Sequence, residues 1–152
     1  MASAATEYSA NTSKSSRLAG IFRRAPLVMM GAIFTMIGLR NLVYTVRSAA
    51  EAGISFTSQS GITIARIGFG AFPLALAVLA LGSLIYKRWR LAGLYMVLIV
   101  DSLATAVRIL SFWLDHSTAS APLLIPEFVL LCLSIIAIRL ERSVTQLRPP
   151  GP

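Results

Sequence analysis

The sequence predicts an all-α integral membrane protein, a four-helix transmembrane bundle whose helices run antiparallel, up-down-up-down. Hydrophobic residues make up 56% of the 152 residues and charged residues only 13%, roughly half the charged share of soluble domains. The mean hydropathy is +0.74. The charged residues lie in short clusters between long apolar runs, which is how basic residues border transmembrane segments. Lipid is therefore the expected solvent for most of the chain.

Four apolar runs account for the predicted spans. The first begins near Pro26, which suits the first position of a helix because its missing N–H needs no partner there. The first three runs reach the roughly 20 residues that cross a bilayer core, whereas the fourth has a shorter uncharged run. We expect a disordered cytoplasmic tail at 1–22, a transmembrane domain at 23–142 with spans at about 26–46, 62–86, 91–113 and 123–139, and a second disordered cytoplasmic tail at 143–152.

The basic residues predict how the chain is threaded. Four precede the first span, three lie in the turn between the second and third spans, and three follow the uncharged run of the fourth. The loops on the opposite side hold Arg47 alone, beside the acidic Glu51 and Asp115. Because cytoplasmic segments carry an excess of Lys and Arg, both termini are predicted to be cytoplasmic. The basic residues are Lys14, Arg17, Arg23, Arg24, Lys87, Arg88, Arg90, Arg139, Arg142 and Arg148.

Five ionisable residues lie within or at the edge of the spans, beyond what this threading explains. A charge in lipid costs about 2.5–3.5 kcal/mol, so such groups normally face the other helices and find partners there. Alternating spans would place Arg66, Arg108 and Glu127 at one level, near the outer ends of their helices. The candidate polar cluster is Arg40, Arg66, Asp101, Arg108 and Glu127.

On the second span, a stripe of small residues follows Arg66 at helical spacing. Small residues allow helices to approach closely in a membrane, so this face is predicted to pack inward and Arg66 to point inward with it. The positions are Arg66, Gly70, Pro73, Ala77 and Ala80.

The third and fourth spans carry the other members of the cluster. Asp101, Thr105 and Arg108 share one face of a helix, and Asp101 and Arg108 are far enough apart to need a bridge by water or Thr105. Glu127 lies in the first turn of its helix, where the helix dipole favours a negative charge. It is the best candidate partner for Arg108 or Arg66.

Two interpretations of the cluster remain open. In the functional interpretation it forms a polar site that opens to the outer face, and with Arg40 included its net charge of +1 suits an anionic ligand. In the structural interpretation it is a network of ion pairs and hydrogen bonds that joins the four helices. Arg108 and Glu127 are expected to be energetically coupled in either case.

Other chemistry-bearing residues lack the partners that a reaction needs. Cys132, the one cysteine, lies in an apolar run and is predicted to be a buried, inert thiol. His116, the one histidine, lies in a short polar loop beside Asp115 and is predicted to be solvated. No catalytic residue, cofactor site or metal site is predicted, and the chain is not expected to be an enzyme. Its net charge of +8 does not indicate nucleic-acid binding, because the basic clusters border spans.

The order of these features resembles the bacterial four-span family known as domain of unknown function 4345. In that family a Gly-Leu stretch ends the first span, an Arg opens the second ahead of small residues, a further Arg lies late in the third, and a Glu begins the fourth. The layout is also similar, by architecture alone, to DoxX-like membrane proteins. The resemblance covers about residues 27–140, leaves Asp101 unassigned and implies a bacterial inner (plasma) membrane but no activity. The matching residues are Gly38-Leu39, Arg66 with Gly70, Val107-Arg108-Ile109, and Pro126-Glu127.

The leading functional prediction is a structural or accessory component of a membrane complex, because the extramembrane loops are small and no catalytic set is present. The alternative is an oligomeric transporter or channel subunit for a small, anionic solute, using the polar cluster. A membrane-embedded enzyme is the third. The expected partners are the lipid bilayer and either another membrane protein or further copies of this chain, and not nucleic acid.

Overall fold

The computed structural model describes residues 18–114 and 121–146, and the described residues are helical apart from short connections. Four helical stretches among them are long and apolar enough to cross a membrane: Leu18–Val43, Gln59–Ile85, Lys87–Leu114 and Ala121–Thr145. Each overlaps one predicted span, so the prediction of a helical chain with four helices able to span a membrane is confirmed for the described residues. The tails at 1–17 and 147–152 and the loop that holds Asp115 and His116 lie outside the described residues.

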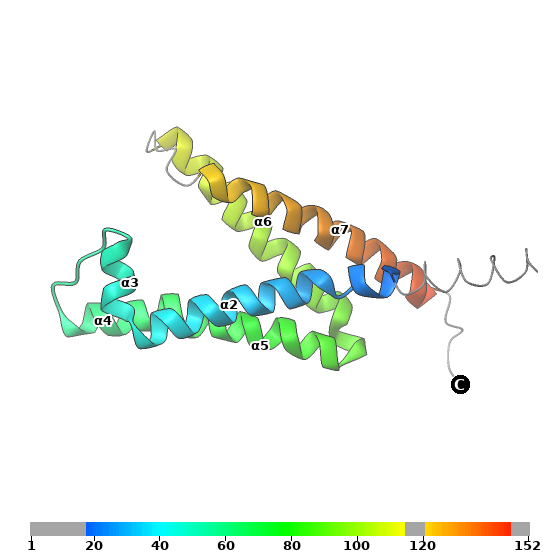
Figure 1. The fold of residues 1–152 in the computed structure, drawn as a ribbon, viewed down its shortest axis with the longest axis horizontal. Coiled ribbons are helices and arrows are strands. Elements are labelled where there is room, and N and C mark those ends of the chain that lie inside the picture. Colours follow the sequence, from blue (N-terminus) through cyan, green and yellow to red (C-terminus); the bar gives the residue numbers. More distant parts are fainter. Residues whose placement is uncertain (1–17, 115–120, 147–152) are drawn as a thin grey trace, which may run out of the picture. The chain divides into compact units, whose positions relative to one another are not determined.

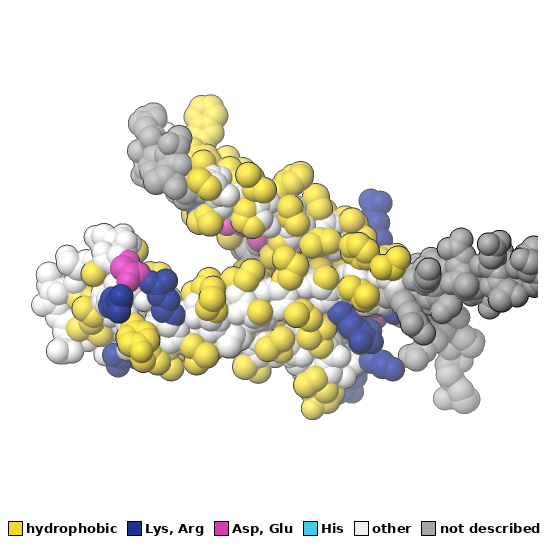
Figure 2. All heavy atoms as spheres, viewed as in Figure 1, with side chains coloured by type: hydrophobic (Ala, Val, Ile, Leu, Met, Phe, Trp, Pro, Cys, Tyr) yellow, Lys and Arg dark blue, Asp and Glu magenta, His cyan; other side chains and the backbone are white. Residues whose placement is uncertain are grey.

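Large apolar side chains are exposed along all four stretches, and Figure 2 shows them covering much of the visible helical surface. In water this exposure would forgo the hydrophobic stabilisation that burial gives, whereas in hydrocarbon it costs nothing. The exposure therefore agrees with a lipid solvent. Examples, one from each stretch, are Met36, Phe72, Leu103 and Phe128.

The chain divides into two compact units: unit 1 comprises Met1–Pro26 and Leu94–Pro152, and unit 2 comprises Leu27–Gly93. Residues 18–22, which the sequence analysis assigned to the tail, are helical. The elements that follow, labelled in Figure 1, are α2 (Ala25–Val43), α3 (Thr45–Glu51), α4 (Gln59–Ala65), the π-helix η1 (Arg66–Ala71), α5 (Phe72–Ile85), the 3₁₀ turn η2 (Lys87–Trp89), α6 (Arg90–Leu114), the 3₁₀ turn η3 (Ala121–Leu123) and α7 (Leu124–Gln146).

The first predicted span ends earlier than expected. We predicted a helix to about residue 46, but α2 ends at Val43 and the chain turns at Tyr44 into α3. Polar side chains near the turn bond to the backbone: Asn41 Nδ2 donates to the Ile37 carbonyl at 2.8 Å, and Thr45 Oγ1 to the Asn41 carbonyl at 2.5 Å. Such bonds compete with regular helical hydrogen bonding and favour a bend. The chain then reverses at Gly53, whose φ of 75° is the left-handed conformation that glycine adopts without strain.

The second span is not one regular α-helix. Between α4 and α5, residues Arg66–Ala71 form a π-helix, and Pro73 follows directly in the first turn of α5. A proline inside a continuous helix lacks a donor and its ring clashes with the carbonyl four residues back. A wider turn ahead of Pro73 relieves both conflicts, as π-bulges in helices commonly do. The predicted α-helical register over 66–71 was therefore wrong.

Unit 2 is held together by close contact between α2 and the helix formed by η1 and α5. A methyl group on Gly38 would lie 2.9 Å from the Gly70 carbonyl oxygen, and one on Gly70 would lie 3.1 Å from the Leu42 backbone nitrogen. Further along α5, Ala77 and Ala80 are buried. The prediction that the stripe of small residues packs inward is confirmed for Gly70, Ala77 and Ala80.

In unit 1 the helices α6 and α7 contact each other through polar side chains. The structure also joins residues near the start of the described chain to the end of α7, since Arg23 Nη1 lies 3.5 Å from Glu141 Oε2. Arg142 lies over the Tyr95 ring, with its guanidinium carbon 5.5 Å from the ring centroid. Cys132 on α7 is exposed, so the prediction that it is buried was wrong. The helix places its side chain on an outer face, among residues such as Val129 and Ile136 that are exposed as well.

Candidate functional site

Arg108 on α6 and Glu127 in the first turn of α7 form a bidentate ion pair. Arg108 Nη2 donates to Glu127 Oε1 at 2.6 Å, and Arg108 Nε lies 3.1 Å from both carboxylate oxygens. The planar guanidinium matches the carboxylate, which makes this geometry stronger than a single contact. Glu127 also lies in the first turn of α7, where the helix dipole stabilises its negative charge. The predicted pairing of Glu127 with Arg108 is confirmed.

Thr105 completes this group. It precedes Arg108 by three residues and so lies on the same face of α6, and its Oγ1 donates to Glu127 Oε2 at 3.3 Å. We predicted that Thr105 or a water would bridge Asp101 and Arg108, but the Thr105 hydroxyl bonds to Glu127 instead. The carboxylate of Glu127 therefore has protein donors on both of its oxygens.

Asp101 lies one turn before Thr105 on α6 and is 4% exposed. Its Oδ2 is closed off and has no hydrogen-bond partner among the described residues. A buried carboxylate without a donor is costly, because burial removes its water and nothing replaces it. Of the predicted cluster, unit 1 thus contains Asp101, Arg108 and Glu127, and the bonds described above join Arg108 to Glu127 and not to Asp101.

Arg66, the first residue of η1, has a different partner from the one predicted. Its side chain is exposed, and the neighbouring Ala65 occupies the buried position. Arg66 Nε donates to Oγ1 of the buried Thr45 at 3.2 Å, which joins η1 to the start of α3. The prediction that Arg66 points inward was wrong for most of the side chain, because the π-helix shifts the register at this position.

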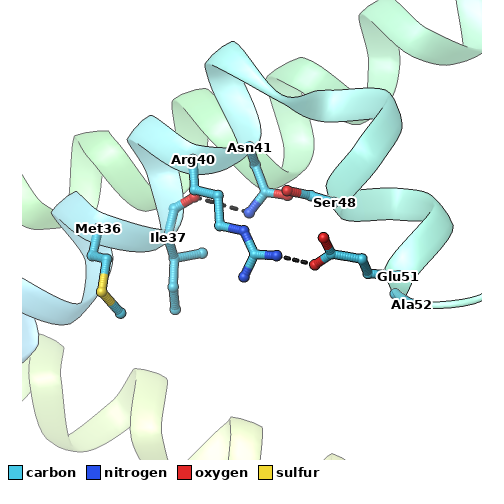
Figure 3. Close-up of a pocket in the computed structure, with 7 residues that line it drawn as sticks. All are labelled: Met36, Ile37, Arg40, Asn41, Ser48, Glu51 and Ala52. Atoms are coloured by element: carbon cyan, nitrogen blue, oxygen red, sulfur yellow. Dashed lines mark hydrogen bonds and ion pairs between the residues drawn. The ribbon is translucent and has the colours of Figure 1, made fainter.

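Arg40, in the last turn of α2, forms an ion pair with Glu51 at the end of α3 (Figure 3). Arg47 shares the same carboxylate, with its Nε 3.3 Å from Glu51 Oε1. Both members of the Arg40–Glu51 pair are open to their surroundings, with side chains 56% and 47% exposed. Glu51 is thus held by two arginines, while Arg40 has one acidic partner.

The structure therefore divides the predicted cluster by unit. Asp101, Arg108 and Glu127 belong to unit 1, whereas Arg40 and Arg66 belong to unit 2. Sequence reasoning missed Glu51 as a partner, although its spacing of four residues from Arg47 on one helix favours an ion pair. Its pairing with Arg40 had no sequence signal, because the turn at Tyr44 brings the two helices together.

Within 18–114 and 121–146, no group of three or more His, Cys, Asp or Glu side chains is placed to hold a metal ion. Comparisons with protein-family models, with curated proteins and with solved structures find no match for this chain. The resemblance to the domain of unknown function 4345 family and to DoxX-like proteins therefore stays a prediction.

Proposed function

We propose that this chain is a structural or accessory subunit of a membrane-protein complex. The observation that carries the proposal is the closed ion pair in unit 1. Arg108 and Glu127 are each occupied by the other, and Thr105 takes a further position on the carboxylate. A group satisfied in this way stabilises the contact of two helices and leaves no charge for a substrate.

The exposed apolar side chains of the candidate spans support the same proposal. They give the helices surfaces that lipid or another membrane protein can cover. Helices associate in membranes through close packing as well as polar contacts, so such surfaces suit a partner that is itself a transmembrane helix.

Purification in mild detergent tests the proposal. The full chain, carrying a tag, is extracted from native membranes and its associated proteins are identified and quantified by mass spectrometry. A partner at about one copy per chain is expected, and it should be absent from an unrelated four-span protein purified with the same tag. Recovery of this chain without any stoichiometric partner protein would contradict an accessory role.

The proposed arrangement in the membrane is antiparallel, with both termini cytoplasmic in a bacterial inner membrane. The distribution of basic residues supports it. Because Cys132 is the one cysteine, a Cys132→Ala chain is free of thiols, and single cysteines can be introduced at Ser58 and Ser143. An impermeant thiol reagent added to intact cells should label the first and not the second. Labelling of both in intact cells would show that the threading is wrong.

Asp101 favours a second candidate function, transport of a small solute. Its Oδ2 is buried and has no hydrogen-bond partner among the described residues, and buried carboxylates of this kind occur in ion and proton pathways of membrane proteins. Asp101, Arg108 and Glu127 together carry one net negative charge, which favours a proton or a cation rather than the anion suggested by the sequence. Proteoliposomes loaded with a pH-sensitive dye test this: Asp101→Asn should abolish proton flux and Glu51→Gln should leave it unchanged. Equal flux in the two variants would exclude Asp101 from a pathway.

A further inference from the structure

Unit 2 contains a pocket of about 420 Å³ at the end of α2, where the chain turns into α3 (Figure 3). This volume lies within the range of sites that hold small molecules or headgroups. The lining combines four polar and three apolar side chains from α2, α3 and the residue after α3. They are Arg40, Asn41, Ser48 and Glu51 on the polar side, and Met36, Ile37 and Ala52 on the apolar side.

The apolar side of the pocket continues along the candidate span. Met36 lies four residues before Arg40 and so on the same face of α2, one turn nearer the middle of the span. Both Met36 and Ile37 are exposed. A ligand that binds at Arg40 can therefore extend along an apolar surface that hydrocarbon chains cover. This arrangement suits an amphiphile better than a fully hydrated ion.

The charges around the pocket favour an anion. Three arginines, Arg40, Arg47 and Arg66, lie on or next to the elements that form it, and Glu51 is the acidic side chain among the lining residues. Arg66 is joined to these elements through Thr45, which in turn bonds to the backbone of Asn41. Figure 2 shows basic and acidic side chains gathered beside α3 in this unit.

Glu51 can release Arg40 without becoming unpaired, because Arg47 also holds its carboxylate. An exposed ion pair of this kind is worth little, about 0–1 kcal/mol, so an incoming anion competes with it easily. Ser48 lines the pocket as well, but its hydroxyl oxygen is buried, so the proposed contact rests on Arg40. Arginine is also the side chain whose planar fork best matches a phosphate group.

We propose that this pocket binds the phosphate group of an anionic phospholipid, with Arg40 as the principal contact and Glu51 as the internal group that the phosphate displaces. The acyl chains lie along the surface that begins at Met36 and Ile37. Lipid is favoured over free phosphate because the pocket lies at the end of a candidate span, where headgroups are found, and because three of its seven lining residues are apolar.

Native mass spectrometry of the full chain in detergent tests the proposal with three probes: dioctanoyl phosphatidylglycerol, dioctanoyl phosphatidylcholine and inorganic phosphate. The wild-type chain should bind phosphatidylglycerol more tightly than phosphatidylcholine. Arg40→Gln should weaken phosphatidylglycerol binding about tenfold, the factor that one charge-assisted hydrogen bond commonly carries. Glu51→Gln should strengthen binding, because the internal competitor loses its charge. Arg88→Gln is the matched control, since Arg88 is an exposed arginine of unit 2 outside the pocket, and it should bind as the wild type does.

The following binding results would overturn the proposal. Unchanged binding by Arg40→Gln, or equal losses in the Arg40 and Arg88 variants, would show non-specific attraction to a basic surface. Competition by inorganic phosphate at millimolar concentration would assign the pocket to the free ion and not to lipid. If Arg40→Gln does not yield a monodisperse helical protein, Glu51→Gln decides the question: tighter binding supports the proposal, and unchanged binding contradicts it.

Discussion

In unit 1 a bidentate ion pair joins α6 and α7, whereas in unit 2 the helices α2 and α5 approach each other at glycines and the ion pairs lie apart from that contact. The two Arg–Glu pairs contain the same groups in different surroundings. The side chains of Arg108 and Glu127 are 21% and 15% exposed, against 56% and 47% for Arg40 and Glu51. Less screening strengthens the first pair and makes the loss of one partner costly. The second pair is weak and can exchange one partner for another.

The comparison teaches that an ion pair in a membrane protein can have opposite uses. Where both groups are partly buried and joined by two parallel hydrogen bonds, the pair stabilises a helix contact. Where both groups are exposed and the carboxylate of Glu51 is shared by two arginines, one arginine is available to a ligand. The chain can separate these uses because close packing at Gly38 and Gly70 supplies the helix contact in unit 2.

The largest expected effect comes from breaking the enclosed pair. Glu127→Ala leaves Arg108 without its carboxylate and should lower the free energy of unfolding by about 3 kcal/mol. Glu51→Ala should cost no more than about 0.5 kcal/mol, because its partners are exposed and remain solvated. Unfolding in mixed micelles, followed by circular dichroism, measures both. Equal losses in the two variants would break the comparison between enclosed and open pairs.

A somewhat smaller loss is expected at the glycine contact of unit 2. The methyl group of Gly38→Ala would lie 2.6 Å from Leu74 Cγ and 2.9 Å from the Gly70 carbonyl oxygen. Relieving this overlap should cost about 2 kcal/mol. Gly82→Ala is the control, since no atom lies within 4 Å of its added carbon, and helix propensity predicts a gain of about 0.5–1 kcal/mol. The same unfolding assay applies, and a neutral Gly38→Ala would refute the close contact.

A double-mutant cycle sharpens the comparison of the two ion pairs. Alanine substitutions at Arg108 and Glu127, singly and together, should give a coupling energy of about 1–2 kcal/mol. The equivalent cycle at Arg40 and Glu51 should give less than about 0.5 kcal/mol. A coupling of zero in the first cycle would show that the bidentate geometry contributes nothing to stability.

The smallest expected change is an increase in the free energy of unfolding, whereas breaking an ion pair or the glycine contact lowers it. Asp101→Asn removes a buried charge that has no protein donor and keeps the size of the side chain, so it should raise the free energy of unfolding by about 1 kcal/mol. Glu127→Gln, which removes a paired charge, should lower it. Parallel unfolding titrations compare the two variants. Destabilisation by Asp101→Asn would mean that the carboxylate has a stabilising partner in the membrane.

Much of the fold could be predicted from the sequence because lipid imposes simple requirements on a chain. In lipid the backbone N–H and C=O groups of a long apolar run must hydrogen-bond to each other, which a helix achieves. The four candidate spans therefore followed from hydropathy. The buried positions Gly70, Ala77 and Ala80 followed from helical spacing. The partner of Arg108 could be named because few acidic groups lie at the ends of apolar helices, and one of them begins α7.

By itself the sequence determined which segments are long and apolar enough to cross a membrane and that Glu127 was available to Arg108. Only the tertiary structure decided that Arg40 contacts Glu51, that Arg66 contacts Thr45 and that Asp101 Oδ2 has no hydrogen-bond partner among the described residues. For Arg40 and Arg66 the physical reason is local departure from regular helix. The turn at Tyr44 and the π-helix ahead of Pro73 rotate the following side chains, and a periodic pattern carries no information about where such departures place them.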